Sequence, residues 1–240
     1  MSGELSGRVI AITGATGGIG QALVLAALRE GAELVLLGRN TSKLQALHAE
    51  CEALTPGRAL MAPLDLEKAV AQDYDRIADA IMQRYERLDG LVHCAALLGT
   101  LTPVEQYDVP TWCRVMHVNL TAAFALTQVL LPALRKSADA AVIFTSSGVG
   151  RRGKAYWGAY AASKFALEGL SQVLADELEG NSRIRVNTVN PGRARTVMRR
   201  QAYPAEDIST LPLPGTLLEP YLRLLGPRGT GITGQALDSQ

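Results

Sequence analysis

A tyrosine and a lysine four residues apart, Tyr160 and Lys164, are the strongest candidates for chemistry in this chain. On a helix, positions i and i+4 share one face, so the phenol would lie beside the ammonium. A neighbouring positive charge favours the phenolate and lowers the pKa of a tyrosine from about 10 toward neutral pH. Tyr160 could then act as a general acid and base. Taken alone the pair is weak evidence, because the same spacing also arises by chance.

Two polar residues elsewhere strengthen the case for a site around this pair. Ser147 stands just past the apolar run Ala140 to Thr145, which reads as a buried strand. Asn119 lies in a predicted helix that a parallel strand order would place nearby. The alternatives are an ordinary loop serine for Ser147 and a helix-bending residue for Asn119.

The stretch Val9 to Gly20 reads V-I-A-I-T-G-A-T-G-G-I-G and leads into Gln21 to Glu30, a segment rich in helix formers. Its apolar start predicts a strand that is buried on both faces. Gly14 permits a tight turn, Gly18 lets the backbone approach a pyrophosphate, and Gly20 lets the helix pack close to the strand. The phosphates would sit on the unpaired N–H groups of the helix N-terminus. This order of strand, turn and helix predicts nucleotide binding, the alternative being a glycine-rich turn without a ligand.

Strands and helices alternate along the rest of the chain. Further strands are predicted over 33–37, 58–63, 89–94, 140–145, 185–189 and 232–237. Helices are predicted over 42–53 with Thr41 as N-cap, 67–88, 104–137, 156–179 and 217–225, with an irregular stretch over 196–216. The alternation predicts an α/β fold with a doubly wound parallel sheet of about seven strands and helices on both faces, in three layers. Ligands of such sheets bind at the carboxyl ends of the strands, where the strand order reverses.

The chain resembles the short-chain dehydrogenase/reductase family, in its ordinary subtype. The matching pieces occur in the family's order and spacing: Thr13-Gly14-x-x-x-Gly18-Ile19-Gly20, Asp65, Asn119, Ser147, Tyr160-x-x-x-Lys164 and Pro191-Gly192-x-x-x-Thr196. Three stretches, 145–151, 157–166 and 195–199, resemble a bacterial subgroup, the YciK-like oxidoreductases. The resemblance implies a Rossmann-type fold and hydride transfer between a nicotinamide cofactor and a carbonyl/alcohol substrate.

The resemblance also implies a role for each matching residue. Tyr160 would transfer the proton to or from the substrate oxygen, which Ser147 would hydrogen-bond as charge develops on it. Lys164 would lower the pKa of Tyr160 and hold the nicotinamide ribose, and Asn119 would help to position a water that relays protons to Lys164. Asp65 would bind the adenine, unless it caps a helix. The cofactor contacts are Gly14, Thr16, Gly18, Ile19, Gly20, Arg39, Asp65, Leu66, Ala95, Tyr160, Lys164, Pro191, Gly192 and Thr196, of which Pro191, Gly192 and Thr196 would hold the nicotinamide amide.

The end of the second predicted strand decides the choice of cofactor. An acidic side chain there would accept the adenosine ribose hydroxyls of NAD, but this chain has Gly38 followed by Arg39. An arginine at this place can pair with a 2′-phosphate. We therefore predict NADP(H) rather than NAD(H), the alternative being a solvent-exposed arginine.

One family motif is altered. After the fourth strand the family usually has Asn-Asn-Ala-Gly, whereas this chain has His93-Cys94-Ala95-Ala96. Cys94 cannot make the hydrogen bonds of an amide, and Ala96 adds a Cβ where the family keeps backbone close to the cofactor. We hypothesise weakened cofactor binding or a locally repacked sheet. This segment is the only support for a second function, a catalytically weak NAD(P)-binding sensor or scaffold. His93 is interpreted as a packed strand-end histidine rather than a catalytic one.

The composition limits the possible partners. The chain is 48% apolar and 20% charged with a net charge of +1, which gives no global field for nucleic acid or membranes. No apolar run is expected to reach membrane-spanning length, and the first eight residues lack a signal-peptide pattern. The three cysteines are scattered without metal-ligand spacing, so we expect reduced thiols in a cytoplasmic protein and no metal site. We expect one domain, 1–240, with a substrate lid over about 196–225.

Two predicted loops beside the substrate pocket are basic. Arg151, Arg152 and Lys154 lie in one, and Arg193, Arg195, Arg199 and Arg200 lie in the other. These charges would suit a small-molecule substrate that is anionic or has a phosphate or carrier-bound tail, the alternative being solvated charges and salt bridges. The long helices around 119–134 and 156–179 suggest a homodimer or homotetramer formed by the family's usual helix bundle.

Overall fold

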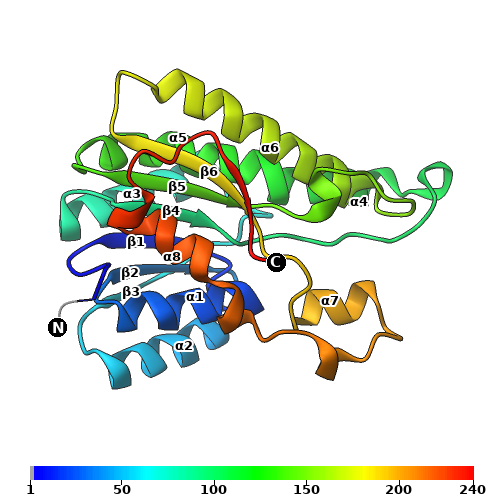
Figure 1. The fold of residues 1–240 in the computed structure, drawn as a ribbon, viewed down its shortest axis with the longest axis horizontal. Helices are drawn as coiled ribbons and strands as arrows, with labels where there is room; N and C mark the ends of the chain where they lie inside the picture. The colour runs from blue at the N-terminus through cyan, green and yellow to red at the C-terminus, as the bar shows by residue number, and fades with distance from the viewer. Residues whose placement is uncertain (1–2) are drawn as a thin grey trace.

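Seven parallel strands form one sheet in the computed structural model, which describes residues 3–240. The strands are β1 (Val9–Thr13), β2 (Glu33–Gly38), β3 (Ala59–Pro63), β4 (Gly90–His93), β5 (Ala140–Thr145), β6 (Ile184–Asn190) and β7 (Ala236–Asp238). Their order across the sheet is β3-β2-β1-β4-β5-β6-β7, and each neighbouring pair is parallel (Figure 1). The predicted doubly wound, Rossmann-type α/β fold is confirmed.

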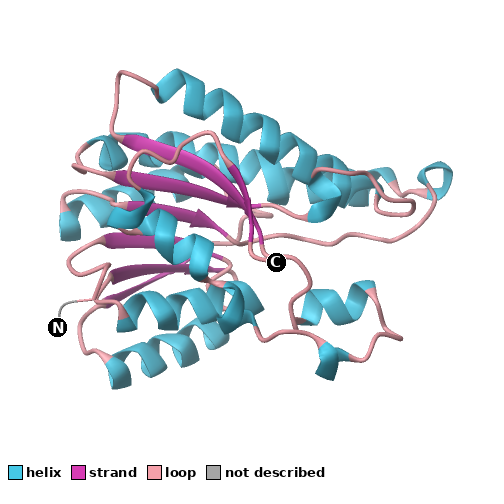
Figure 2. Cartoon of the chain, in the orientation of Figure 1, coloured by secondary structure: helices cyan, strands magenta, loops and turns pink. Residues whose placement is uncertain are grey.

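Helices cover both faces of this sheet (Figure 2). They are α1 (Gly18–Arg29), α2 (Thr41–Leu54), α3 (Ala71–Tyr85), α4 (Val109–Met116), α5 (Ala122–Arg135), α6 (Gly158–Leu178), α7 (Val197–Ala202) and α8 (Glu219–Leu225). The buried side chains of α3, α5 and α6 form a core with one face, and those of α1, α2 and α8 form a core with the other. The result is the predicted three-layer arrangement.

Successive residues of each central strand serve the two cores in turn. In β1, Val9 and Ala11 belong to the core under α3, α5 and α6, whereas Ile10 and Ile12 belong to the core under α1, α2 and α8. All residues of β1 are buried. A strand covered on both faces needs apolar side chains at every position, which explains the continuous apolar run in the sequence.

The strand order reverses between β1 and β4. At their carboxyl ends these strands are adjacent, since Thr13 pairs with His93 in the parallel register. The crevice at such a reversal is the place where doubly wound sheets bind ligands. The glycine turn after β1 and the altered segment after β4 therefore meet at the expected ligand site.

Several element boundaries differ from the sequence predictions. The predicted helix over 67–88 is too long, because α3 begins at Ala71 and ends where Glu86 adopts a left-handed φ of 63°. The N-cap of α2 is Asn40 rather than Thr41, and its Oδ1 accepts the N–H of Lys43 at 2.9 Å. The last strand is shorter than predicted over 232–237 and comprises only Ala236–Asp238.

The predicted helical stretch over 104–137 is interrupted twice. A 3₁₀ turn (Val104–Gln106) is followed by α4, and a π-helical turn (His117–Thr121) then leads into α5. Pro132 lies inside α5, where its ring removes one backbone donor. Single π turns inside helices often mark functional sites, and this one contains Asn119.

By length and composition alone, the helical stretch Val109–Arg135 could cross a membrane, with a mean hydropathy of 1.4 over its most apolar window. The stretch is not a continuous apolar run, however, because it contains Arg114, His117 and Asn119. In the fold, Leu126, Leu130 and Leu134 of α5 are fully buried against the sheet. A helix that covers the middle of a sheet needs an apolar face, so it passes the same test as a membrane span.

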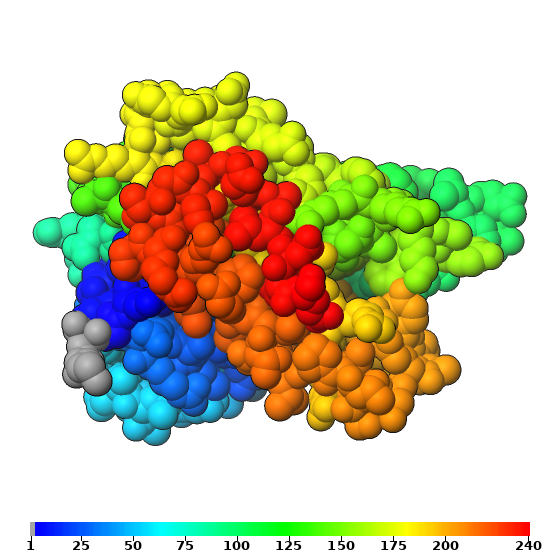
Figure 3. All heavy atoms as spheres, in the orientation of Figure 1, coloured from blue at the N-terminus to red at the C-terminus, as the bar shows by residue number. Residues whose placement is uncertain are grey.

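The chain after β6 returns across the front of the molecule. Figure 3 shows the C-terminal residues, coloured red, on the surface between α6 above and the orange segment below. The stretch over 196–216, predicted to be irregular, contains α7. By contrast, α8 belongs to the core, because Tyr221, Leu224 and Leu225 are completely buried. This burial anchors the C-terminal end of the predicted lid.

Candidate functional site

A cavity of about 510 Å³ opens at the carboxyl ends of the parallel strands. Its wall contains all the predicted cofactor residues: Gly14, Thr16, Gly18, Ile19, Gly20, Arg39, Asp65, Leu66, Ala95, Pro191, Gly192 and Thr196, with Tyr160 and Lys164. Ser147 lines the same cavity, whereas Asn119 does not. The described residues, 3–240, hold no cluster of three or more potential metal ligands.

The glycine turn after β1 is packed so closely against neighbouring segments that it has no space for side chains. Gly14 has a φ of +63°, and a Cβ there would lie 2.7 Å from the backbone nitrogen of Ala95. A Cβ on Gly18 would lie 2.6 Å from Cγ2 of Thr196, and one on Gly20 would collide with the carbonyl oxygen of Gly14. The N-terminus of α1 has no side-chain cap and no acidic residue in its first turn, so its N–H groups suit an anion. These residues fit the pyrophosphate of a dinucleotide.

Asp65 forms a turn at another part of the wall. Its Oδ1 accepts the N–H of Glu67 at 3.2 Å. It does not cap the following helix, because α3 begins at Ala71 with Val70 as its N-cap. The carboxylate lines the cavity beside Leu66, where the resemblance places the adenine.

The side chain of Lys164 is deeply buried beside the cavity. The residue is 2% exposed, and its Nζ donates to the carbonyl oxygen of Thr145 at 2.7 Å. The Nζ also lies 5.6 Å from the centroid of the Tyr160 ring, as their spacing on α6 predicts. Burial lowers the pKa of Lys164 from 10.5 to about 8, although electrostatic interactions with Cys94 and Glu168 act in the opposite direction. The ammonium is therefore held between the strand end and the phenol.

The phenol of Tyr160 does not have the lowered pKa that the sequence predicted. Burial raises the pKa of Tyr160 from 10.0 to about 12, and a hydrogen bond with Ser147 only partly offsets this effect. Loss of hydration penalises the phenolate, while the nearby ammonium of Lys164 is directed at Thr145. Tyr160 is thus a protonated phenol at neutral pH, suited to give a proton to an oxygen that gains negative charge.

The loop after β5 presents Ser147 to the cavity. Ser147 is the N-cap of a 3₁₀ turn, Gly148–Gly150, and its Oγ accepts the N–H of Val149 at 3.4 Å. The turn packs tightly against α6, since a Cβ on Gly150 would lie 2.8 Å from Cβ of Lys164. A hydroxyl that accepts through a lone pair keeps its own proton to donate, so Ser147 can donate to a ligand oxygen.

Asn119 fixes the backbone behind the cavity rather than lining it. Its Oδ1 accepts the N–H of Leu97 at 2.7 Å, and its Nδ2 donates to the Leu97 carbonyl at 2.9 Å and to Ser163 Oγ at 3.0 Å. This buried amide ties the segment after β4 to the π-helical turn and to α6. Leu97 itself lines the cavity, so Asn119 shapes the wall indirectly. The predicted water relay to Lys164 stays a prediction.

His93 is a packed side chain at the end of β4. It is 4% exposed, its Nε2 lies 2.8 Å from Thr127 Oγ1, and its ring stacks on Phe144 with centroids 5.0 Å apart. Burial lowers the pKa of His93 from 6.5 to about 3, and the positive charge of Lys164 acts in the same direction. The imidazole is therefore neutral and part of the core.

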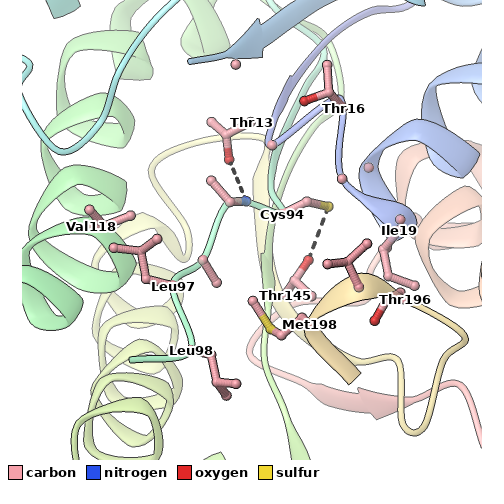
Figure 4. Close-up of a pocket in the computed structure, with 18 of the residues that line it drawn as sticks. Thr13, Thr16, Ile19, Cys94, Leu97, Leu98, Val118, Thr145, Thr196 and Met198 are labelled. Atoms are coloured by element: carbon pink, nitrogen blue, oxygen red, sulfur yellow. Dashed lines mark hydrogen bonds between the residues drawn. The ribbon is translucent and has the colours of Figure 1, made fainter. Parts of the chain in front are cut away.

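The altered segment after β4 is tied to both neighbouring strands (Figure 4). The Sγ of Cys94 lies 3.4 Å from Thr145 Oγ1, and the N–H of Ala95 donates to Thr13 Oγ1 at 3.2 Å. The parallel register of β4 with β1 and β5 is regular through His93. The contact between the Cys94 thiol and the Thr145 hydroxyl therefore takes the place of the family's asparagine amide. The regular register shows that the sheet is not repacked.

Arg39 and a residue that the sequence analysis missed, Lys43, make one end of the cavity basic. Nη1 of Arg39 lies 3.5 Å from Oε2 of Glu67, and the side chain is 57% exposed. Glu67 makes a closer ion pair with Arg114, at 2.7 Å. Lys43 lies in the first turn of α2, the helix that follows the second strand. A basic residue at this place in the sequence could have indicated a second phosphate contact.

Apolar side chains that the sequence did not single out line the other end of the cavity. They are Leu97, Leu98, Val118, Trp157, Met198 and Ala202 (Figure 4 labels four of them). The ring of Trp157 lies 5.7 Å from that of Tyr160 and 5.8 Å from that of Tyr203. Lys154 Nζ donates to Tyr203 Oη at 2.6 Å, which joins the loop after β5 to the segment that follows α7.

Besides Lys154, which binds Tyr203, three of the basic residues predicted beside the pocket have partners within the chain. Arg151 pairs with Asp238 at 2.7 Å, and Arg199 pairs with Glu206 at 2.5 Å. Arg195 donates to the backbone carbonyls of Ser209 and Leu211. These three arginines therefore agree with the alternative interpretation, in which the basic residues pair within the chain. Arg152, Arg193 and Arg200 are exposed.

Comparison with known proteins identifies the family. The family model described as short chain dehydrogenase matches residues 8–207. The Escherichia coli K12 protein named Uncharacterized oxidoreductase YciK is 44% identical over 236 residues, which cover 98% of this chain and 93% of that protein. A solved structure from Pseudomonas syringae, described as a short chain dehydrogenase, matches with a TM-score of 0.98 and 48% identity over 100% of this chain and 97% of that one. Another, from Escherichia coli CFT073 complexed with NADPH, matches with a TM-score of 0.97 and 44% identity over 100% of this chain and 99% of that one. The chain therefore belongs to the short-chain dehydrogenase/reductase family, and it is similar to the YciK-like oxidoreductases.

Proposed function

We propose that this chain is an NADP(H)-dependent reductase that transfers hydride between the nicotinamide and a carbonyl/alcohol pair, with Tyr160 as general acid and base. The main support for the proposal is that Ser147, Tyr160 and Lys164 line the same cavity as the glycine turn of residues 14–20, here called the glycine cradle. A protein that only bound a nucleotide would need the cradle but not two hydroxyl donors beside a buried ammonium.

The three side chains divide the proton chemistry. When bound, the nicotinamide supplies or accepts the hydride. In the reduction direction, Tyr160 donates its proton to the carbonyl oxygen as charge develops there, and the Ser147 hydroxyl donates a hydrogen bond to the same oxygen. The raised pKa of Tyr160, about 12, keeps the proton on the phenol until that moment. The ammonium of Lys164 then stabilises the phenolate that remains.

The cavity wall supports the choice of NADP(H). Arg39 at the end of β2 and Lys43 in the first turn of α2 provide two cationic donors where an acidic residue would select NAD(H). The similar structure from Escherichia coli CFT073 is complexed with NADPH. Pro191, Gly192 and Thr196 are proposed to hold the nicotinamide amide at the opposite end.

The apolar end of the cavity supports a carbonyl substrate with an apolar substituent. Leu97, Trp157 and Met198 form this end, and the predicted lid over 196–225 contributes the last of them. An anionic group on the far side of the substrate is a second possibility, which the exposed Arg152 and Arg200 favour.

A helix stripe on α6 supports the proposed homo-oligomer. Phe165 and Val173 are 45% and 55% exposed, and Gly169 lies between them with open space around it. Spacings of four residues place these positions on one face of the helix. Phe124 on α5 is also 47% exposed. Such apolar faces fit a dimer or tetramer built from α5 and α6.

Calorimetry and one variant test this function against the sensor or scaffold alternative. NADPH and then NADH are titrated into the wild-type protein and into Tyr160→Phe, and both proteins are assayed with NADPH and a panel of ketones and aldehydes. The proposal predicts tight NADPH binding by both proteins and turnover by the wild type alone. NADPH binding without turnover of any carbonyl by the wild type favours the sensor, and absence of NADPH binding contradicts both functions.

A further inference from the structure

One buried carboxylate beside the site has no part in the proposed mechanism. Glu168 is 8% exposed and lies one helical turn after Lys164 on α6. A carboxylate is costly to bury unless hydrogen bonds and a positive charge compensate for its lost hydration. Its partners therefore show what this charge does in the fold.

One carboxylate oxygen of Glu168 holds the loop after β5 at both ends, and the other binds β6. Oε1 accepts hydrogen bonds from Ser146 Oγ and from Arg151 Nε, the latter at 3.4 Å. Oε2 accepts from Thr188 Oγ1 of β6 at 2.7 Å. Because Ser146 and Arg151 flank Ser147 and its 3₁₀ turn, a single carboxylate fixes the short loop that presents Ser147 to the cavity.

The same carboxylate also acts on Lys164. The groups that raise the pKa of Lys164 are Cys94, from the segment after β4, and Glu168, from its own helix. Burial raises the pKa of the Cys94 thiol to about 11, so this thiol is neutral at neutral pH. His93 on β4 and Tyr160 on α6 are neutral as well. Glu168 is therefore the negative charge among these groups.

We propose that Glu168 is a positioning residue of the reductase site, which fixes the loop that carries Ser147 and places a carboxylate one helical turn from Lys164. The inference rests on the proposed roles of Ser147 and Lys164. Glu168 acts through both residues and needs no contact with the substrate.

Hydrogen exchange tests the loop clamp without any need for activity. Glu168→Gln keeps the size of the side chain but removes its charge and places an amide NH₂ near the Ser146 and Arg151 donors. Amide exchange in peptides covering residues 146–152 is expected to become about tenfold faster, the effect of losing one charge-assisted hydrogen bond. Peptides from α1 should not change. Glu177→Gln, an exposed substitution on the same helix, is the control and should exchange as the wild type does.

Kinetics test the effect on the catalytic group. With NADPH and any carbonyl that the wild type reduces, Glu168→Gln should lower kcat about tenfold while KM and the NADPH Kd stay within about twofold. Without the negative charge Lys164 loses its proton more easily, so the alkaline limb of kcat should move to lower pH. Wild-type exchange in the loop together with an unshifted pH profile overturns the proposal.

Two other experimental outcomes also bear on the proposed role of Glu168. If the wild type reduces no carbonyl, the proposed function fails, whereas loop exchange still reports whether the clamp exists. If Glu168→Gln does not fold, Ser146→Ala removes one arm of the clamp and leaves the charge. This variant should also speed exchange over 146–152 and lower kcat; wild-type values for both contradict the clamp.

Discussion

At the scale of single residues, burial sets the protonation of the proposed proton donor and of its neighbour. The pKa of Tyr160 is raised to about 12 and that of Lys164 is lowered to about 8, in both cases chiefly because the charged form loses hydration. The site therefore holds a phenol that keeps its proton and an ammonium that is close to losing it. The proposed reduction of a carbonyl would use the phenol of Tyr160 as its proton donor.

The choice of cofactor is also argued from one residue. Arg39→Ala removes the guanidinium that faces the proposed 2′-phosphate, and a charge-assisted contact of this kind contributes about 1.5–3 kcal/mol. We expect the KM for NADPH to rise about tenfold to hundredfold and the KM for NADH to change by less than about twofold. Steady-state kinetics with both cofactors provide the measurement. Equal effects on the two cofactors would show that Arg39 does not recognise the phosphate.

At the scale of elements, the segment after β4 shows how the fold accommodates an altered motif. A thiol–hydroxyl contact between Cys94 and Thr145 replaces an amide, and Asn119 holds the next turn of the segment through Leu97. The strand register and the cavity wall are both kept. The altered residues therefore change the number of strong hydrogen bonds beside the glycine cradle.

Restoring the family's residues in this segment should strengthen cofactor binding. In Cys94→Asn with Ala96→Gly, an amide regains its hydrogen bonds and a Cβ is removed beside the cradle, so we expect the NADPH Kd to fall about threefold to tenfold. Calorimetry gives the constant, and Cys113→Asn, at an exposed cysteine, is the control. An unchanged Kd for the double variant would show that the alteration has no cost for binding.

At the scale of the whole molecule, two cores hold the sheet, and the buried His93 lies in the strand layer between them. A histidine whose folded-state pKa lies below its unfolded value favours the unfolded state once acid protonates the unfolded chain. Its folded pKa is about 3 against 6.5, so stability is complete above pH 6.5 and is lost as the pH falls toward 3. This buried ring therefore makes the fold sensitive to acid.

The size of this effect follows from the two pKa values. At about pH 5 the proton bound only by the unfolded chain costs about 2 kcal/mol of unfolding free energy relative to neutral pH. In His93→Gln, which keeps a donor for Thr127, the loss of stability between neutral pH and pH 5 should be smaller by about that amount. Urea unfolding at both pH values measures it, with the partly exposed His48→Gln as control. Equal acid losses in His93→Gln and the wild type would rule out this origin.

The sequence predicts the fold and the residues of the cavity wall well, because glycine turns, apolar strands and the Tyr160–Lys164 spacing are local patterns. It does not predict that the pKa of Tyr160 rises, since desolvation depends on what packs around the phenol. It also could not show that Asn119 lies behind the wall, that Arg199 is neutralised by Glu206, or that α3 ends at Tyr85. These properties depend on tertiary contacts between distant segments.

The most direct test of the central claim follows the hydride itself. The wild type and Tyr160→Phe are incubated with NADPH that is deuterated at the transferred position and with a ketone that the wild type reduces, and the alcohol is analysed by mass spectrometry. The proposed site predicts one deuterium on the carbinol carbon with the wild type, and a loss of product of at least about a thousandfold with Tyr160→Phe, which should still bind NADPH. Unlabelled alcohol from the wild type, or labelled alcohol formed equally fast by Tyr160→Phe, would contradict it.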